Sequence, residues 1–368
     1  MKTKIIKCIA ITLCALLVMA ACGRQSPQEE EYEPQETPVA QGYTGIAEAT
    51  EPIIPQDTPA QDGIHGLISV VEYGQNRAYI MGSMHVGREG WYPLSPVAET
   101  AMDNADVFAF EIDIGAEGGQ CLCTPETCEC NCDPDMYECI CLLMEMMHLS
   151  PGVTLSDFLP EDAYEAFGSN LLTFGIEIEA LSELRPTAIT ELILYQIIAP
   201  SLGLSAEYSI DMYVFNRAGA LGRPVIGLTD FNDHIAFIAG MPDEYQVATA
   251  RYFSDLQTAL DEMEELALIY ENQDIDALTQ MIRSGLAEAY EAFVEMEISA
   301  EGLGLARYWH YTVGNYRSTF FAHQIADLLT QTQEPTTFFI TVGIAHLTRE
   351  VNVFYTLGEM GFEVVGLY

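Results

Sequence analysis

A chain of 368 residues that is 49% hydrophobic carries enough apolar side chains for a sizeable core in one or two domains. Its formal net charge of −41 at pH 7 disfavours nucleic acid and anionic lipid headgroups as partners and favours cationic ones, such as metal ions and basic peptides. Solubility, or adaptation to an acidic or saline exterior, explains the charge more simply, so the charge alone assigns no partner.

The first 22 residues predict a secretory leader. Three lysines within the first seven residues precede an apolar run at 9–21, which is too short for a stable membrane span. The end of that run, VMAAC, resembles a bacterial lipobox. We therefore expect cleavage before Cys22 and a lipid anchor on this cysteine, which would hold the protein on the extracytoplasmic face of the cell membrane. The alternative is an ordinary cleaved signal followed by free secretion.

The next segment, residues 23–62, is rich in proline, glutamate and glutamine. It offers little apolar surface to offset chain entropy, so we expect a disordered acidic tether. A single folded domain is then predicted over residues 63–368. It begins with two β-rich runs, at 66–73 and 77–83, which the intervening Gly-Gln-Asn makes a plausible hairpin.

A helix and a third strand follow. Ser95 and Pro96 suit the N-cap and first position of a helix over 94–105. The next run, 106–115, is strand-like and delivers Glu111 and Asp113 near its end.

Most of the following two hundred residues have helical spacing, and strands return near the C-terminus. Helices are predicted over 160–175, 186–200, 209–222, 244–273, 304–331 and 348–361, and strands over 223–230, 338–342 and 362–368. The sum is an α/β (α+β) fold whose central sheet combines strands from both ends of the chain, with a large helical middle.

Two strands end in the same motif, glycine followed by histidine three residues later. The motifs place His85 after Gly82 and His346 after Gly343. Ligands of doubly wound sheets bind outside the carboxyl ends of the strands, and glycine there permits a sharp turn or a close ligand. If the two strands are neighbours, both histidines reach one cleft, and Glu111 ends the next strand. A lone histidine in this place is usually structural, but the duplication favours function.

Two imidazoles and a carboxylate suit two kinds of chemistry. They can hold a divalent metal ion with an open position for water, or they can act as base and acid without a metal. The residue pattern leaves both possibilities open.

The motifs GSMH, FEID and VGIAHL resemble those of the TraB/GumN family, which includes the TIKI proteases. The resemblance spans roughly residues 63–368, with weaker matches at 183–186, 203–228 and Arg317. It implies an α/β fold akin to erythromycin-esterase-like proteins and, for the TIKI branch, divalent-metal-dependent peptide hydrolysis. The implied catalytic residues and metal ligands are His85, Glu111 and His346, with Arg317 as an anion contact. An N/O ligand set suits zinc, manganese or cobalt.

The chain departs from the family pattern in three places. Thr229 and Asp230 stand where Leu-Glu is frequent, and Asp230 could replace that glutamate. Ser318 follows Arg317 where asparagine is commoner, and Thr348 and Arg349 follow the second histidine motif where the family tends towards glycine.

A cysteine-rich insert occupies residues 121–141, with seven cysteines. Disulfides are the usual state of dense cysteines outside the cell, but repeated Cys-x-Cys also suits a thiolate metal cluster. Either way we expect a lid or rim near Glu111.

The sequence therefore predicts a membrane-anchored extracytoplasmic hydrolase of peptides or small esters, assisted by a divalent metal ion. No P-loop, dinucleotide fingerprint or Gly-x-Ser-x-Gly elbow is present, which disfavours ATP use, hydride transfer and serine hydrolysis. The rival hypothesis is a non-catalytic surface lipoprotein that binds a peptide signal or a metal complex. A weaker third is an inactive structural surface protein that makes contacts through the cysteine-rich loop.

Overall fold

The computed structural model describes residues 64, 66–112, 147–229, 241–252, 256–284 and 314–367. The predicted leader, Cys22, the tether and the cysteine-rich insert lie outside these residues, as do Asp113 and Asp230. Within the described ranges, no helix combines the length and the apolar character needed to cross a bilayer.

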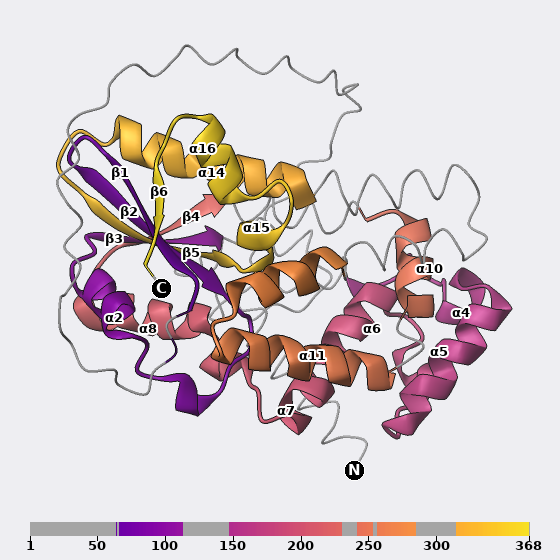
Figure 1. The fold of residues 1–368 in the computed structure, drawn as a ribbon. Coiled ribbons are helices and arrows are strands. Elements are labelled where there is room, and N and C mark those ends of the chain that lie inside the picture. The colour runs from indigo at the N-terminus through magenta and orange to yellow at the C-terminus, as the bar shows by residue number, and fades with distance from the viewer. Residues whose placement is uncertain are drawn as a thin grey trace, which may run out of the picture.

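A six-stranded sheet forms the centre of the described structure, in the order β4-β3-β5-β2-β1-β6 (Figure 1). The predicted hairpin is present: β1 (Ile68–Tyr73) runs antiparallel to β2 (Asn76–Ser83). Gly74 makes the turn with a φ of 61°, a backbone conformation that glycine adopts without a Cβ clash. The last strand, β6 (Val364–Gly366), pairs antiparallel with β1 at the edge.

Four consecutive strands of the sheet, β4, β3, β5 and β2, are parallel and point their carboxyl ends to one edge. β5 (Thr337–Gly343) lies between β2 and β3 (Val107–Ile112), and β4 (Val225–Thr229) flanks β3. The pairing of β2 with β5 sets Ser83 opposite Gly343. The two strands that carry the Gly-x-x-His motifs are therefore direct neighbours, which is the condition for both histidines to reach one cleft.

Helices cover both faces of the sheet, which confirms the mixed α/β class. On one face lie α14 (Gly314–Gln331) and α16 (Val353–Glu359), and on the other lie α2 (Pro96–Asp103) and α8 (Ile210–Leu221) (Figure 1). Both α2 and α8 begin with a serine N-cap. Ser95 accepts a hydrogen bond from the Ala98 N–H, and Ser209 accepts one from the Met212 N–H. Both caps satisfy donors that a helix start leaves free.

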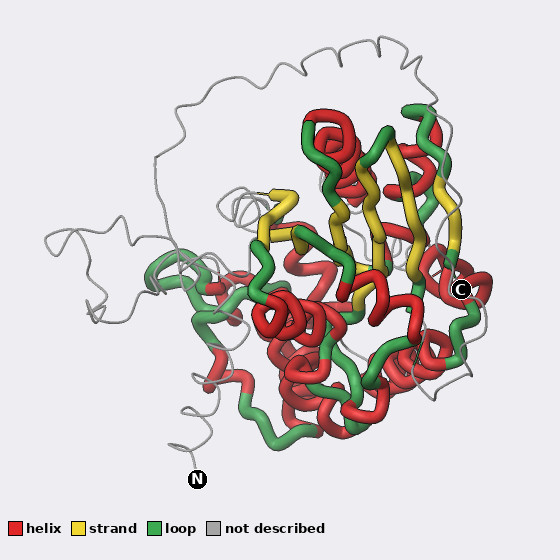
Figure 2. The backbone as a smooth tube through the Cα atoms, turned by 90° about the vertical axis from the view of Figure 1, so that its left-hand side faces the viewer, coloured by secondary structure: helices red, strands yellow, loops and turns green. Residues whose placement is uncertain are grey.

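The helical middle forms a lobe with its own apolar cluster beside the sheet (Figure 2). Phe167, Leu171, Ile189 and Ile193 are fully enclosed there. The lobe and its connections comprise α4 (Leu155–Phe158), α5 (Glu161–Thr173), α6 (Pro186–Ile193), a short π-helix (Leu194–Ile198), α7 (Ala199–Ser201), α10 (Asp243–Tyr252), α11 (Leu256–Glu271) and short 3₁₀ turns at Ile178–Leu181 and Ala206–Tyr208. A further 3₁₀ turn, Glu89–Trp91, lies between β2 and α2, and its Trp91 packs in the core of the sheet.

One predicted helix is divided within the described residues. The predicted helix 348–361 is wrong in its first turn: α15 (Ala345–Thr348) ends there, and α16 starts anew after Asn352, whose side chain accepts from the Tyr355 N–H. An asparagine cap explains the break, because its side chain competes with helical pairing. The predicted helix 244–273 is present as α10 and α11, and residues 253–255 lie outside the described structure.

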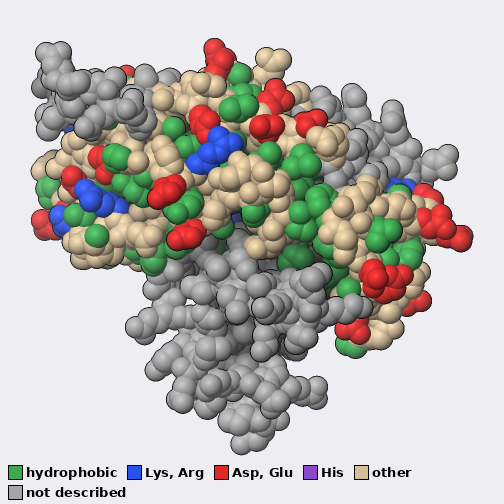
Figure 3. Space-filling model, turned by 90° about the horizontal axis from the view of Figure 1, so that it is seen from below, with side chains coloured by type: hydrophobic (Ala, Val, Ile, Leu, Met, Phe, Trp, Pro, Cys, Tyr) green, Lys and Arg blue, Asp and Glu red, His purple; other side chains and the backbone are tan. Residues whose placement is uncertain are grey.

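Acidic side chains dominate the charged surface seen from below, where few arginines are visible (Figure 3). This view agrees with the strongly negative formal charge of the chain.

Candidate functional site

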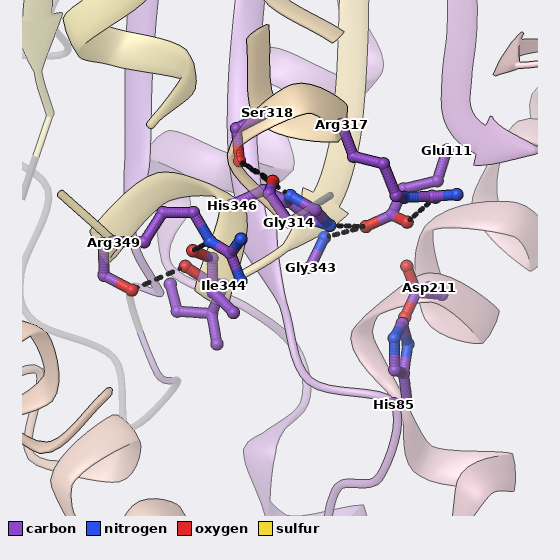
Figure 4. Close-up of polar contacts among 12 residues, drawn as sticks. His85, Glu111, Asp211, Gly314, Arg317, Ser318, Gly343, Ile344, His346 and Arg349 are labelled. Carbon is purple, nitrogen blue, oxygen red and sulfur yellow. Dashed lines mark hydrogen bonds and ion pairs between the residues drawn. The ribbon is translucent and has the colours of Figure 1, made fainter. Parts of the chain in front are cut away.

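The predicted site residues come together at the carboxyl edge of the parallel strands (Figure 4). His85 follows β2, Glu111 lies on β3 and His346 lies on α15, the short helix after β5. All three surround Gly343: a Cβ placed on this glycine would lie 3.0 Å from Glu111 Oε1, 3.8 Å from His346 Cδ2 and 3.9 Å from His85 Nε2. Glycine at this strand end thus leaves room for the two imidazoles and the carboxylate.

Glu111 is held by two donors. Its Oε1 accepts a hydrogen bond from the Gly343 N–H at 2.7 Å, and its Oε2 accepts one from Arg317 Nη2 at 3.0 Å. Burial disfavours the charged carboxylate, but His346 (protonated at the acidic pH where Glu111 titrates), Arg317, His85 and the Gly343 N–H together lower the pKa of Glu111 to about 2. Glu111 is therefore ionised at neutral pH and fixed in position.

His346 presents its Nε2 to the site. The Ser318 hydroxyl donates to the Gly314 carbonyl at 3.1 Å, so at 2.9 Å it accepts from His346 Nδ1. This arrangement puts the proton of the neutral ring on Nδ1 and leaves a lone pair on Nε2, which lies 3.8 Å from Glu111 Oε1. Burial lowers the pKa of His346 to about 4; the attraction of Glu111 opposes this shift, and the charges of Arg349, Arg317 and His85 add to it. The ring is neutral at pH 7.

His85 has the opposite proton state. Its Nδ1 donates to Asp211 Oδ2 at 3.1 Å, which turns Nε2 towards Gly343. The side chain is 54% exposed. The protein around it still removes part of its hydration, and this desolvation alone would lower the pKa of His85. The hydrogen bond and charge of Asp211, with Glu111 and Glu191 beyond, prevail and raise the pKa of His85 to about 9. This imidazole is protonated at neutral pH.

Asp211 is a residue of the candidate site that the sequence interpretation missed. It lies in the first turn of α8 and is only 9% exposed. A signal was present, because Asp211 precedes Val214 and Ala218 by three and seven residues and so shares their buried face. A carboxylate on the apolar stripe of a helix needs a partner, and the partner is His85.

The expected metal ligands do not form a ready ligand set. Among the residues that the structure describes, no group of three or more His, Cys, Asp or Glu side chains is placed to hold a metal ion. Both oxygens of Glu111 already accept hydrogen bonds, one of them from the cationic Arg317. The outer partners of the imidazoles, Asp211 and Ser318, are of the kind that orient ligating histidines. Metal binding by His85, Glu111 and His346 stays a prediction.

A model of the TraB/PrgY/gumN family matches residues 67–365. The matched range includes both Gly-x-x-His motifs, all of β1 to β5 and the first two residues of β6. No match was found among curated proteins or among solved structures.

Proposed function

The chain belongs to the TraB/PrgY/gumN family, and on this premise we propose that it hydrolyses peptides or small esters at the site around Gly343. The observation that carries the proposal is the contrast between two imidazoles near one point, since the pKa of His346 is lowered to about 4 and that of His85 is raised to about 9. Titratable groups whose pKa values are pushed apart indicate a base and an acid.

Hydrolysis would use the two imidazoles in sequence. His346 Nε2 takes a proton from water while the water oxygen attacks the substrate carbonyl carbon. His85 Nε2–H then gives its proton to the leaving nitrogen or oxygen as the bond to the carbonyl carbon breaks. Arg317 stabilises negative charge that develops on the carbonyl oxygen, and ionised Glu111 keeps Arg317 and the Gly343 N–H in place.

Assistance by zinc, manganese or cobalt is a separate part of the proposal. When bound, such an ion would make water a stronger nucleophile by lowering its pKa. Dialysis against a chelator, followed by elemental analysis and by assay with each ion restored, tests this part. Full activity of protein shown to be free of metal would reject the ion and leave the imidazole pair.

The test of hydrolysis uses a mixture of synthetic peptides and mass spectrometry to find new fragments. We expect the wild-type protein to form fragments and His85→Ala or His346→Ala to lower the rate by about 10²–10⁴-fold. His323→Ala is the matched control, because His323 is an exposed histidine of α14. Circular dichroism must show that each variant is folded.

Two outcomes would overturn hydrolysis at this site. One is full activity in both folded histidine variants. The other is saturable binding of peptides that stay intact, which would instead support the non-catalytic binding protein.

Attachment to the membrane through Cys22 also belongs to the proposal. It is supported by the leader sequence and by the lipobox-like VMAAC alone. Cell fractionation tests it: we expect the wild-type chain with the membranes and Cys22→Ala in the soluble fraction, and membrane retention of the variant would contradict it.

A further inference from the structure

Arg349 differs from most of the arginines that the structure describes. It is only 8% exposed, and its Nε donates to the Ala345 carbonyl at 3.2 Å. Within the described residues, its terminal amino groups have no hydrogen-bond or ion-pair partner. Arginines that do pair with a carboxylate there are Arg77, Arg88, Arg217, Arg223, Arg251 and Arg317.

The guanidinium of Arg349 lies beside the proposed site (Figure 4). It packs directly on Gly314, where any Cβ would overlap with Nη1. Gly314 shares one face of α14 with Arg317 and Ser318, which contact Glu111 and His346 respectively. One helix face therefore arranges Arg349, His346 and Glu111 next to one another.

No carboxylate among the described residues forms an ion pair with Arg349. Glu111 pairs with Arg317 and acts on Arg349 only at longer range, and Asp211 pairs with His85. Burying a guanidinium without an anion is costly, and one bond to a backbone carbonyl uses one of its five N–H donors. The positive charge of Arg349 suits a monoanion, and its planar guanidinium fork matches a carboxylate.

We propose that Arg349 binds the terminal carboxylate of a peptide substrate, so that hydrolysis occurs near the carboxyl end of the peptide. This inference rests on the proposed function of the same site and adds its substrate class. Arg349 is here a specificity residue, because it holds the substrate and takes no part in proton transfer.

The experiment uses random-sequence hexapeptides with acetylated N-termini, synthesised once with a free terminal carboxylate and once as the amide. Immobilised wild-type protein, Arg349→Gln and Arg223→Gln are incubated with each mixture, and mass spectrometry measures retained peptides and new fragments. Arg223→Gln is the matched control, because it removes the same charge from an ion pair with Asp106, both partners being substantially exposed.

We expect wild-type protein and Arg223→Gln to retain the free-carboxylate peptides about tenfold or more better than the amides, the effect of a charge-assisted hydrogen bond. Arg349→Gln should lose this preference. Where fragments form, its KM should rise with little change in kcat, because the lost contact is the same in the ground state and the transition state.

The wild-type comparison needs no variant, so it can refute the proposal even if Arg349→Gln does not fold. Equal retention of both mixtures by wild-type protein would overturn the role of Arg349, as would an undiminished preference in folded Arg349→Gln. Retention that depends on Arg349 without fragments supports carboxylate binding while refuting hydrolysis. Fragments that form without any preference for the free-carboxylate peptides would support hydrolysis and refute carboxylate binding by Arg349.

Discussion

At the scale of single residues, the site depends on two histidines made different by their neighbours. His346 is enclosed and flanked by Arg317 and Arg349, which disfavour its charged form, whereas His85 donates to the Asp211 carboxylate, which favours it. The same side chain thus acquires a pKa of about 4 in one place and about 9 in the other. Composition alone could not have assigned these two roles.

This contrast predicts the pH profile of hydrolysis. The base His346 must be neutral, so kcat/KM should rise as pH increases through about 4. The acid His85 must be protonated, so kcat/KM should fall as pH increases through about 9. Initial rates between pH 3 and 10.5 measure both limbs. An activity that is absent at pH 7 and rises only where His85 loses its proton would contradict the acid role and favour neutral, ligating imidazoles.

The basic limb should depend on Asp211. Asp211→Asn removes the negative charge that raises the pKa of His85, so the limb should move from about 9 towards the ordinary value of 6.5. The acidic limb should stay near 4, because Asp211 is not among the groups that shift the pKa of His346. Asp103→Asn is the control, since Asp103 pairs with Arg217 at an exposed position. A basic limb unmoved in Asp211→Asn would disprove the pairing.

The sequence predicted which side chains gather at the candidate site but not their proton states. Both histidines and Glu111 were predictable because the motif repeats at strand ends and because parallel strands share a carboxyl edge. The partners were less accessible: Asp211 lies 126 residues from His85 in the chain, and only the assembled fold joins them. Ser318 and Arg349 stand out in sequence as departures from the family pattern, yet neither reveals its contact there.

At the scale of elements, the end of β5 decides whether the site can form. The Gly343 N–H donates a hydrogen bond to Glu111. Because glycine has no Cβ, the polar side chains of the site can lie close to this strand end. Its register opposite Ser83 of β2 places both Gly-x-x-His motifs at the same level of the sheet.

Gly343→Ala should therefore lower activity more than stability. The new Cβ would lie 3.0 Å from Glu111 Oε1, closer than nearly all real contacts of this kind, so the carboxylate must shift away from the Gly343 N–H. We expect a loss of about tenfold or more in kcat/KM, since a small displacement of a catalytic group lowers the reaction rate steeply. Gly358→Ala is the control, because a Cβ there meets nothing within 4 Å. Its helical position in α16 should make that change neutral or stabilising. Equal activities of the two variants would contradict this role of Gly343.

The strands were predictable from sequence to a greater extent than the order in which they pair. Alternating or apolar runs marked the strands, and serine caps marked the starts of α2 and α8. The order β4-β3-β5-β2-β1-β6 depends on long-range pairing that no local pattern encodes. The division between α15 and α16 was missed because the Asn352 cap interrupts a run whose spacing is otherwise helical.

At the scale of the whole molecule, the helical middle supplies part of the site as well as a second core. Glu191 comes from α6 of this lobe and Asp211 from α8, which covers the sheet, and both charges act on His85. The sheet carries Glu111 and sets the two histidine motifs at its edge. The site thus depends on how the sheet and the helical middle pack together, and loosening that packing would affect the proton state of His85 first.

The charge of the whole chain predicts how its stability responds to salt. With a formal net charge of −41, the folded protein suffers self-repulsion that is weakly screened at about 10 mM salt, where the Debye length is about 30 Å. Raising NaCl to about 0.5 M should increase Tm by several degrees. Salt also weakens surface ion pairs, but exposed pairs such as Arg223–Asp106 contribute at most about 1 kcal/mol each. Differential scanning calorimetry at pH 7 measures the shift. It should shrink at about pH 4.5, where many carboxylates are protonated, and a Tm that falls with salt at pH 7 would contradict the argument.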